Sequence, residues 1–184
     1  TDALEDAFHL ISDFSSPIGI GHLRYSTVGL KGLRNAQPLK VGDSFFIAHN
    51  GTISNTEELV ELIGSEYNIP SSASDTQIAG LRLHQILKKT HDDWFSAFDL
   101  LSSELNGSYS FVFLTNKGDI YAARDEKGFR PLCIGLQEES ESLVVASESC
   151  ALFALGAKLI RDVKPGEIVK IGAGGLQSHT FSDG

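Results

Sequence analysis

Hydrophobic residues recur at helical spacing in four segments of the chain. The first segment, residues 2–14, carries Leu4, Phe8 and Ile11 on one side and predicts a short amphipathic helix. Three more helices are predicted over residues 55–63, 75–88 and 93–105, each with a polar residue able to cap its first turn. The side chains expected to face the core from these three helices are Leu59, Leu62, Ile63, Ala79, Leu83, Ile86, Leu87, Trp94, Phe98, Leu101 and Leu105.

From residue 107 onward the apolar residues alternate with polar ones, which indicates β-strands. Tyr109, Phe111 and Phe113 share one face of the first predicted strand, and residues 120–124 return as its hairpin partner. The other strands predicted in this half of the chain are 132–136, 143–147 and 168–171, the last followed by a hairpin turn at 172–175.

Two strands are predicted near the start of the chain, over residues 18–27 and 44–48, with a glycine-rich loop at 28–34 between them. The second strand is expected to end in a sharp turn with positive φ at His49-Asn50-Gly51. In total the pattern predicts about seven strands and four or five helices, and the helices are grouped, so we expect an α+β fold with layered antiparallel sheets. No shift in composition divides residues 1–184, which we interpret as a single domain.

Charge and composition exclude several classes of protein. Among 184 residues, 24 acidic side chains outnumber 15 basic ones, and the formal net charge of −9 disfavours a nucleic acid partner. No apolar run approaches the roughly 20 residues that cross a bilayer, so no membrane association is expected. Two cysteines make no disulfide scaffold, and the expected location is the cytoplasm. The chain contains no methionine, which indicates a piece of a longer protein.

Four polar stretches carry the candidate chemistry, and each has an ordinary structural explanation when taken alone. An arginine at a strand end is usually solvated, an Asn-Gly pair is usually a turn, and an aspartate at a helix start complements the helix dipole. Together they supply a fork for a carboxylate, a partner for an ammonium group and an oxyanion site, as needed to hold an α-amino acid while its side-chain carbonyl is attacked. The stretches are Gly21-His22-Leu23-Arg24-Tyr25-Ser26-Thr27, Asn35-Ala36-Gln37-Pro38, His49-Asn50-Gly51 and Ser74-Asp75-Thr76.

In this order, the stretches resemble the glutaminase domain of class II glutamine amidotransferases, which carry G-H-x-R-aromatic-S/A-T, H-N-G and S-D-T motifs. The resemblance implies an N-terminal-nucleophile hydrolase fold, in which two stacked antiparallel sheets lie between helical layers in the order αββα. It also implies that an N-terminal cysteine attacks the amide of glutamine and that the released ammonia passes to a second domain. This chain is expected to lack the first strands of that fold.

Within that family, the chain most resembles the amidophosphoribosyltransferases, which form phosphoribosylamine in purine biosynthesis. The Asn35-Ala36-Gln37-Pro38 stretch is similar to their N-A-Q-P motif, and residues 124–132 are similar to their R-D-x-x-G-x-R-P-L motif. Tyr25 stands where hexosamine-forming enzymes usually have tryptophan. A glutaminase domain of another class II enzyme, of the glutamate synthase or hexosamine-forming type, remains the alternative.

The resemblance implies a role for each candidate residue. Arg24 would bind the α-carboxylate of glutamine, and Asp75 would bind its α-ammonium group. The side-chain amide of Asn50 and the backbone N–H of Gly51 would form the oxyanion hole. The same pocket would be lined by Tyr25 and Thr27.

The resemblance also implies partners outside this chain. It implies glutamine as the substrate, a C-terminal phosphoribosyltransferase domain and a homo-oligomer at full length. Magnesium is expected with that second domain, and no cofactor or metal is expected in this one. The six histidines are consistent with the absence of a metal site, because none of them shows the spacing of a zinc motif.

The family's cysteine nucleophile has no counterpart in this chain. Thr1 directly precedes a predicted helix and not an apolar strand, and Cys133 and Cys150 have apolar neighbours that predict small core residues. We therefore expect the 184-residue chain by itself to release no ammonia from glutamine. The alternative from a different class is a catalytically silent module that binds glutamine, and a Cys-Gly pair encoded upstream would favour the enzyme.

Overall fold

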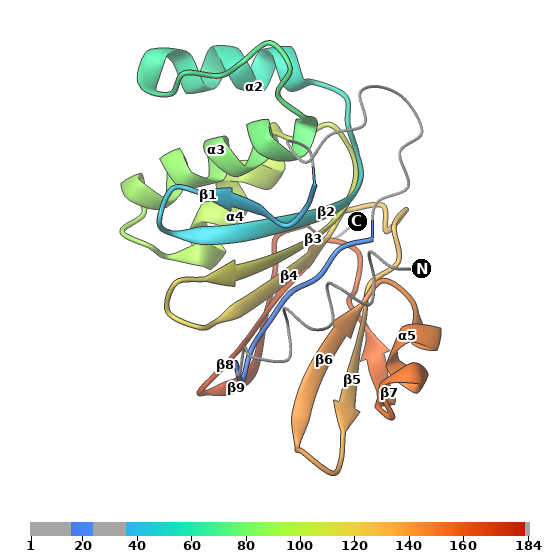
Figure 1. Ribbon diagram of the computed structural model, residues 1–184. Coiled ribbons are helices and arrows are strands. Elements are labelled where there is room, and N and C mark those ends of the chain that lie inside the picture. Colours follow the sequence, from blue (N-terminus) through green and yellow to red (C-terminus); the bar gives the residue numbers. More distant parts are fainter. Residues whose placement is uncertain (1–15, 24–35, 183–184) are drawn as a thin grey trace, which may run out of the picture.

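The computed structural model describes residues 16–23 and 36–182 (Figure 1). The helix predicted over 2–14 and the loop predicted over 28–34 lie outside these ranges. The strand predicted over 18–27 is wrong for residues 18–23, which form no strand. This segment contacts the sheet through a side chain and not through a ladder, because His22 bonds the backbone of a neighbouring strand.

Six antiparallel strands form the larger sheet, in the order β1-β2-β3-β4-β8-β9. Its longest pairing is β2·β3, in which nine residues of each strand face one another. The strands are β1 Leu39–Val41, β2 Phe45–Ile53, β3 Gly107–Thr115, β4 Ile120–Arg124, β8 Glu167–Gly172 and β9 Gly175–Thr180.

A second antiparallel sheet has the order β6-β5-β7 and carries a short helix, α5, on one side (Figure 1). The β5·β6 pair confirms the strand pair predicted over 132–136 and 143–147. The sequence pattern did not predict β7 or α5, because neither shows regular spacing of apolar residues. Their bounds are β5 Cys133–Gln137, β6 Ser142–Ala146, β7 Lys158–Asp162 and α5 Ser149–Ala154.

Three α-helices cover the opposite side of the larger sheet (Figure 1). They confirm the three predicted helices to within two residues at each end. One predicted core residue is wrong: Leu62 is 49% exposed, because the short helix α2 buries only the stripe of Leu59 and Ile63. The bounds are α2 Thr56–Ile63, α3 Asp75–Lys89 and α4 Trp94–Glu104, with a 3-10 turn, η2 Gly64–Glu66, after α2.

Three separate hydrophobic cores define four layers. The largest lies between the helices and the six-stranded sheet, where Phe98 of α4 meets Phe111 of β3. A second, including Ile134 of β5 and Val169 of β8, lies between the two sheets. The third joins the smaller sheet to α5 through Leu152. The order helix, sheet, sheet, helix confirms the predicted αββα class of N-terminal-nucleophile hydrolases.

The motif at residues 124–132 turns the chain from one sheet to the other. The buried carboxylate of Asp125 accepts hydrogen bonds from the backbone N–H groups of Lys127 and Phe129 at 3.1 Å, and from those of Tyr109 and Arg130 at 3.3 Å. A buried charge is tolerated when such donors satisfy it. This carboxylate therefore organises the loop.

Candidate active site

The candidate site is built on the outer edge of β2. One edge of β2 pairs with β3 along its whole length. The other edge pairs with β1, and this pairing ends where Leu39 faces Ile47. Beyond Ile47, the backbone groups on this outer edge need other partners.

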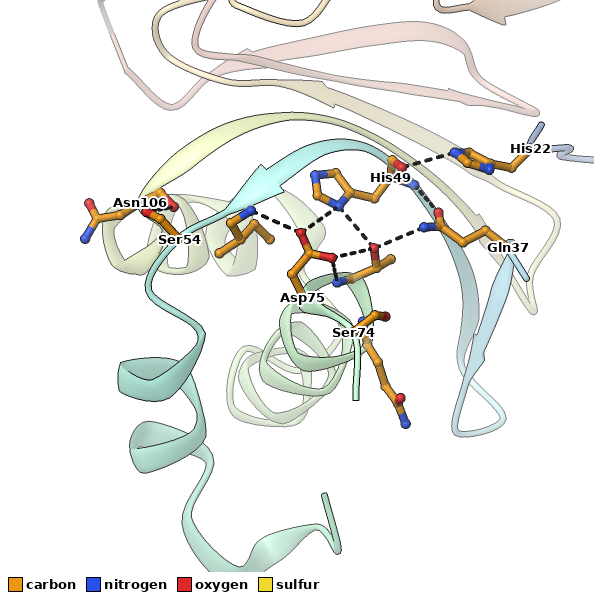
Figure 2. A network of polar contacts seen from close by, with 10 residues as sticks. His22, Gln37, His49, Ser54, Ser74, Asp75 and Asn106 are labelled. Atoms are coloured by element: carbon orange, nitrogen blue, oxygen red, sulfur yellow. Dashed lines mark hydrogen bonds and ion pairs between the residues drawn. The ribbon is translucent and has the colours of Figure 1, made fainter. Parts of the chain in front are cut away.

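At His49, two side chains take the place of the missing strand (Figure 2). The backbone N–H of His49 donates to Oε1 of Gln37 at 2.6 Å. Its carbonyl oxygen accepts a hydrogen bond from Nε2 of His22 at 3.1 Å. Residues from two of the four polar stretches thus hold the first residue of the His49-Asn50-Gly51 stretch.

The alternation of an antiparallel strand fixes which N–H groups share this outer edge. In such a strand, every second residue directs its N–H and C=O to the same side. The backbone N–H groups of Ile47 and His49 point away from β3. So does that of Ile53, which donates to Oδ2 of Asp75 at 3.1 Å. The same alternation directs the N–H of Gly51 outward, between the occupied donors of His49 and Ile53.

Gly51 continues the strand, so the predicted turn at this position is wrong. Asn50 faces Ser110 and Gly51 faces Tyr109 in the β2·β3 pair. The turn prediction failed because an Asn-Gly pair is typical of turns, whereas the pairing with β3 is a tertiary effect. Its positive φ was predicted correctly: the value is 148°, and a Cβ here would lie 2.0 Å from the carbonyl oxygen of Ser108.

Asp75 is the first residue of α3 and is held at the end of β2 (Figure 2). Ser74 caps the helix by accepting from the N–H of Gln77 at 3.2 Å. One carboxylate oxygen of Asp75 accepts from the N–H of Thr76 at 2.7 Å, and the other accepts from the N–H of Ile53. The Asp75 side chain is still 28% exposed, so its carboxylate retains room for a further donor.

The ring of His49 lies beside this carboxylate and is buried. Its Nδ1 atom is 3.1 Å from Oγ1 of Thr76 and 3.8 Å from Oδ2 of Asp75. Burial lowers the pKa of His49 below its usual value and outweighs the nearby Asp75 carboxylate, which raises it. His49 is therefore uncharged at neutral pH, and its ring packs and forms a hydrogen bond beside the site.

A cleft of about 710 Å³ joins these groups. One wall carries Asn50, Gly51 and Asp75, and the other is formed by residues 144–148, 150 and 151, from the end of β6 to the start of α5. Three predicted site residues from two separate stretches of the sequence therefore share one cavity. The other three, Arg24, Tyr25 and Thr27, lie outside the described residues, although the segment before them lines the cleft through Gly21, His22 and Leu23.

The two cysteines differ in their surroundings. Cys133 is buried in the smaller sheet, as predicted. Cys150 is exposed and lines the cleft, so its prediction as a core residue is wrong. The reason is local: it lies in the first turn of α5, where Leu152 is the residue that faces the core.

The sequence analysis did not predict the hydrogen bonds of His22, Gln37, His49 and Thr76. All four residues lie in the four polar stretches, and this was the one feature of the sequence that could have indicated a role for them. Within the described ranges, no group of three or more His, Cys, Asp or Glu side chains is placed to hold a metal ion. No helix in those ranges is long and apolar enough to cross a membrane.

Comparisons with known proteins agree with this geometry. Residues 22–154 match the family described as "Glutamine amidotransferase domain". The chain is 39% identical over 170 residues to the amidophosphoribosyltransferase of Methanocaldococcus jannaschii, covering 91% of this chain and 35% of the relative. It is 35% identical over 167 residues to that of Bacillus subtilis, covering 89% and 34%. The chain thus spans about a third of the length of these curated relatives.

Comparison with solved structures also indicates a glutamine amidotransferase domain. The glutamine phosphoribosylpyrophosphate (PRPP) amidotransferase from B. subtilis, complexed with ADP and GMP, has a TM-score of 0.75 and 32% identity, covering 89% of this chain and 34% of that one. A glutamine aminotransferase class-II domain protein from Silicibacter pomeroyi shares the fold, with a TM-score of 0.61, 18% identity, and coverage of 82% and 72%. These findings confirm the resemblance seen in the sequence motifs. Since the domain match covers well over half of the chain, this chain belongs to the family of glutamine amidotransferase domains.

Proposed function

We propose that this chain is the glutaminase domain of an amidophosphoribosyltransferase, in which ammonia from glutamine is used to form phosphoribosylamine for purine biosynthesis. The observation that carries the proposal is the shared cleft: the carboxylate of Asp75 and the outer edge of β2 at Asn50 and Gly51 face one cavity. The names of the relatives support the choice among class II enzymes.

Asp75 is proposed to bind the α-ammonium group of glutamine. Its carboxylate is held by two backbone N–H groups and remains partly exposed to the cleft. The Thr76 hydroxyl also donates to this carboxylate, at 3.3 Å. An ionised carboxylate accepts about four hydrogen bonds, so a ligand ammonium group adds to these three donors without displacing them. Arg24 is proposed to pair with the α-carboxylate, because a guanidinium fork matches a planar carboxylate. Tyr25 and Thr27 are proposed to line the same pocket.

The N–H of Gly51 and the side-chain amide of Asn50 are proposed to form the oxyanion hole. When a nucleophile attacks the amide carbon of glutamine, negative charge develops on the carbonyl oxygen, and fixed donors stabilise it. The alternation of β2 supports this role for Gly51, since its outward N–H lies between donors that are already occupied. The family resemblance assigns the attack to an N-terminal cysteine, which is not part of this chain.

The remaining parts of the proposal concern the whole protein. The curated relatives are about three times as long as the stretch that matches, which leaves room for a C-terminal phosphoribosyltransferase domain. That domain would hold magnesium and use the ammonia. We also propose a homo-oligomer in the cytoplasm.

The full-length protein tests the glutamine clamp through Arg24→Lys. A lysine cannot reproduce two parallel hydrogen bonds to a carboxylate, so the KM for glutamine should rise. The fall in kcat/KM should correspond to a loss of about 2 to 4 kcal/mol in transition-state stabilisation. Activity with free ammonia should survive, because ammonia bypasses this pocket. Equal loss of both activities would contradict the clamp. Glutamine binding without any turnover in the parent protein would favour the silent module.

A further inference from the structure

Gln37 belongs to the Asn35-Ala36-Gln37-Pro38 stretch, which the proposed function leaves without a role. We infer that Gln37 is a positioning residue for glutamine hydrolysis, which holds the Asn50-Gly51 edge of β2 in place through His49. This inference rests on the proposed function, since it concerns the same site. Gln37 itself is not placed on the substrate.

The amide of Gln37 joins two elements that carry the site (Figure 2). Its Oε1 atom accepts from the backbone N–H of His49 in β2 at 2.6 Å. Its Nε2 atom donates to Oγ1 of Thr76 in α3 at 3.1 Å, and the same oxygen is 3.1 Å from Nδ1 of His49. Gln37, Thr76 and His49 therefore form a closed triangle of hydrogen bonds.

This triangle replaces a strand pair that has ended. The pairing of β1 with β2 stops at Leu39 and Ile47, two residues before His49. A side-chain amide offers the same acceptor and donor as a peptide group, so Gln37 supplies the acceptor that a longer β1 would have supplied. An aliphatic side chain of equal length would leave the N–H of His49 without this partner.

The position of this bond gives Gln37 its effect on the site. His49 directly precedes Asn50, and the next tether on the same edge is the bond from Ile53 to Asp75. The outward N–H of Gly51 lies between these two anchors. Oxyanion donors act at 2.7 to 3.1 Å and need placement within roughly 0.5 Å, so release of one anchor weakens stabilisation of the transition state more than binding of glutamine.

The test uses the full-length protein with Gln37→Met, which keeps the side-chain length and removes both hydrogen bonds. We expect kcat with glutamine to fall about 10- to 100-fold, with the KM for glutamine within about threefold of the parent value. Activity with free ammonia should stay unchanged. Thr76→Val breaks the same triangle from α3 and should lower kcat in the same way, so the test can still be decided if Gln37→Met does not fold. Only kcat is compared for this variant, because the Thr76 hydroxyl also donates to Oδ1 of Asp75 at 3.3 Å.

Asn116→Met is the matched control. The amide of Asn116 also bonds backbone beside β2, donating to the carbonyl oxygen of Asp43 at 3.0 Å, but at the end remote from the cleft. Its kcat with glutamine should match the parent. A double-mutant cycle adds a second readout: if Gln37 acts through the oxyanion edge, Gln37→Met should cost a smaller factor in an Asn50→Ala background than in the parent, because only the N–H of Gly51 then remains to be positioned.

Three results would overturn the inference. They are full glutamine-dependent kcat in both triangle variants, equal loss of glutamine- and ammonia-dependent rates, and full additivity with Asn50→Ala. A parent protein that uses ammonia but not glutamine would instead overturn the proposed function itself. The two failures are therefore distinguishable in one set of assays.

Discussion

At Gly51, the requirements of the backbone and of the proposed chemistry meet in one residue. A φ of 148° is strained for any residue with a side chain, and the nearest backbone atom would lie 2.0 Å from a new Cβ. Gly156 provides a matched comparison, because its φ is also positive, at 68°, but no atom lies within 4 Å of the position that a Cβ would occupy. The two glycines separate steric collision from strain alone.

Gly51→Ala should therefore destabilise the fold far more than Gly156→Ala. We expect a loss of about 1 kcal/mol for Gly156→Ala from strain alone, and more than about 3 kcal/mol for Gly51→Ala, because Ser108 belongs to the paired strand and cannot move freely. Urea unfolding followed through Trp94 fluorescence measures both. Equal losses would mean that the close approach of β2 and β3 at this point is not rigid.

The neutral state of His49 predicts how stability depends on pH. Burial lowers the pKa of His49 in the folded state, so below about pH 6.5 the unfolded chain binds a proton that the folded chain resists. The contribution of His49 to the free energy of unfolding should be constant above pH 6.5. It should decrease as the pH falls toward 5. Burial also lowers the pKa of His84, which adds to the same trend.

The variant His49→Gln isolates the contribution of His49. Between pH 7.5 and 5.5 its free energy of unfolding should fall less than that of the parent, and the remaining slope should come from groups such as His84. Urea titrations at the two pH values provide the comparison. An unchanged slope would show that His49 is not held neutral in the folded protein.

At the scale of elements, α3 holds one side of the site by its first turn. Ser74→Ala removes the cap bond to the N–H of Gln77 and should cost about 1 kcal/mol in the free energy of unfolding. Ser71→Ala, in the exposed stretch before the helix, serves as the control and should change it by less than about 0.5 kcal/mol. Urea unfolding of both variants gives the comparison, and equal effects would contradict a specific role for the cap.

The sequence predicted the helices and strands in which apolar residues recur at regular spacing. The helices α3 and α4 and the β3·β4 hairpin follow from regular apolar spacing, and the buried face of Tyr109, Phe111 and Phe113 was correct. Elements without such spacing were missed, as α5 and β7 show. The extension of β2 through Gly51 was also missed, since it depends on pairing with residues more than fifty positions away.

The candidate site shows a similar division. Asn50, Gly51 and Asp75 could be selected from the sequence because their motifs are distinctive, and the structure brings them to one cleft. The supporting bonds of Gln37 and His22 could not be predicted, because they replace strand pairing that ends at Ile47. A motif thus identifies residues, whereas the tertiary fold decides which of them bond to one another.

At the scale of the whole molecule, the cleft is lined by residues from all four layers. The larger sheet and α3 contribute Asn50, Gly51 and Asp75, and the smaller sheet with α5 contributes the opposing wall. One hydrophobic core joins the larger sheet to its helices and another joins the smaller sheet to α5, so each wall is backed by a core of its own. This arrangement places a polar site between packed layers.

The most direct test of the account compares two nitrogen sources in the full-length protein carrying Asn50→Ala. Loss of an oxyanion donor should lower kcat with glutamine by about 100- to 1,000-fold, while the rate with free ammonia stays at the parent value. Asn68→Ala, at an exposed position before α3, should leave both rates unchanged. If Asn50→Ala instead lowers both rates equally, or lowers neither, the assignment of this cleft to glutamine hydrolysis is contradicted.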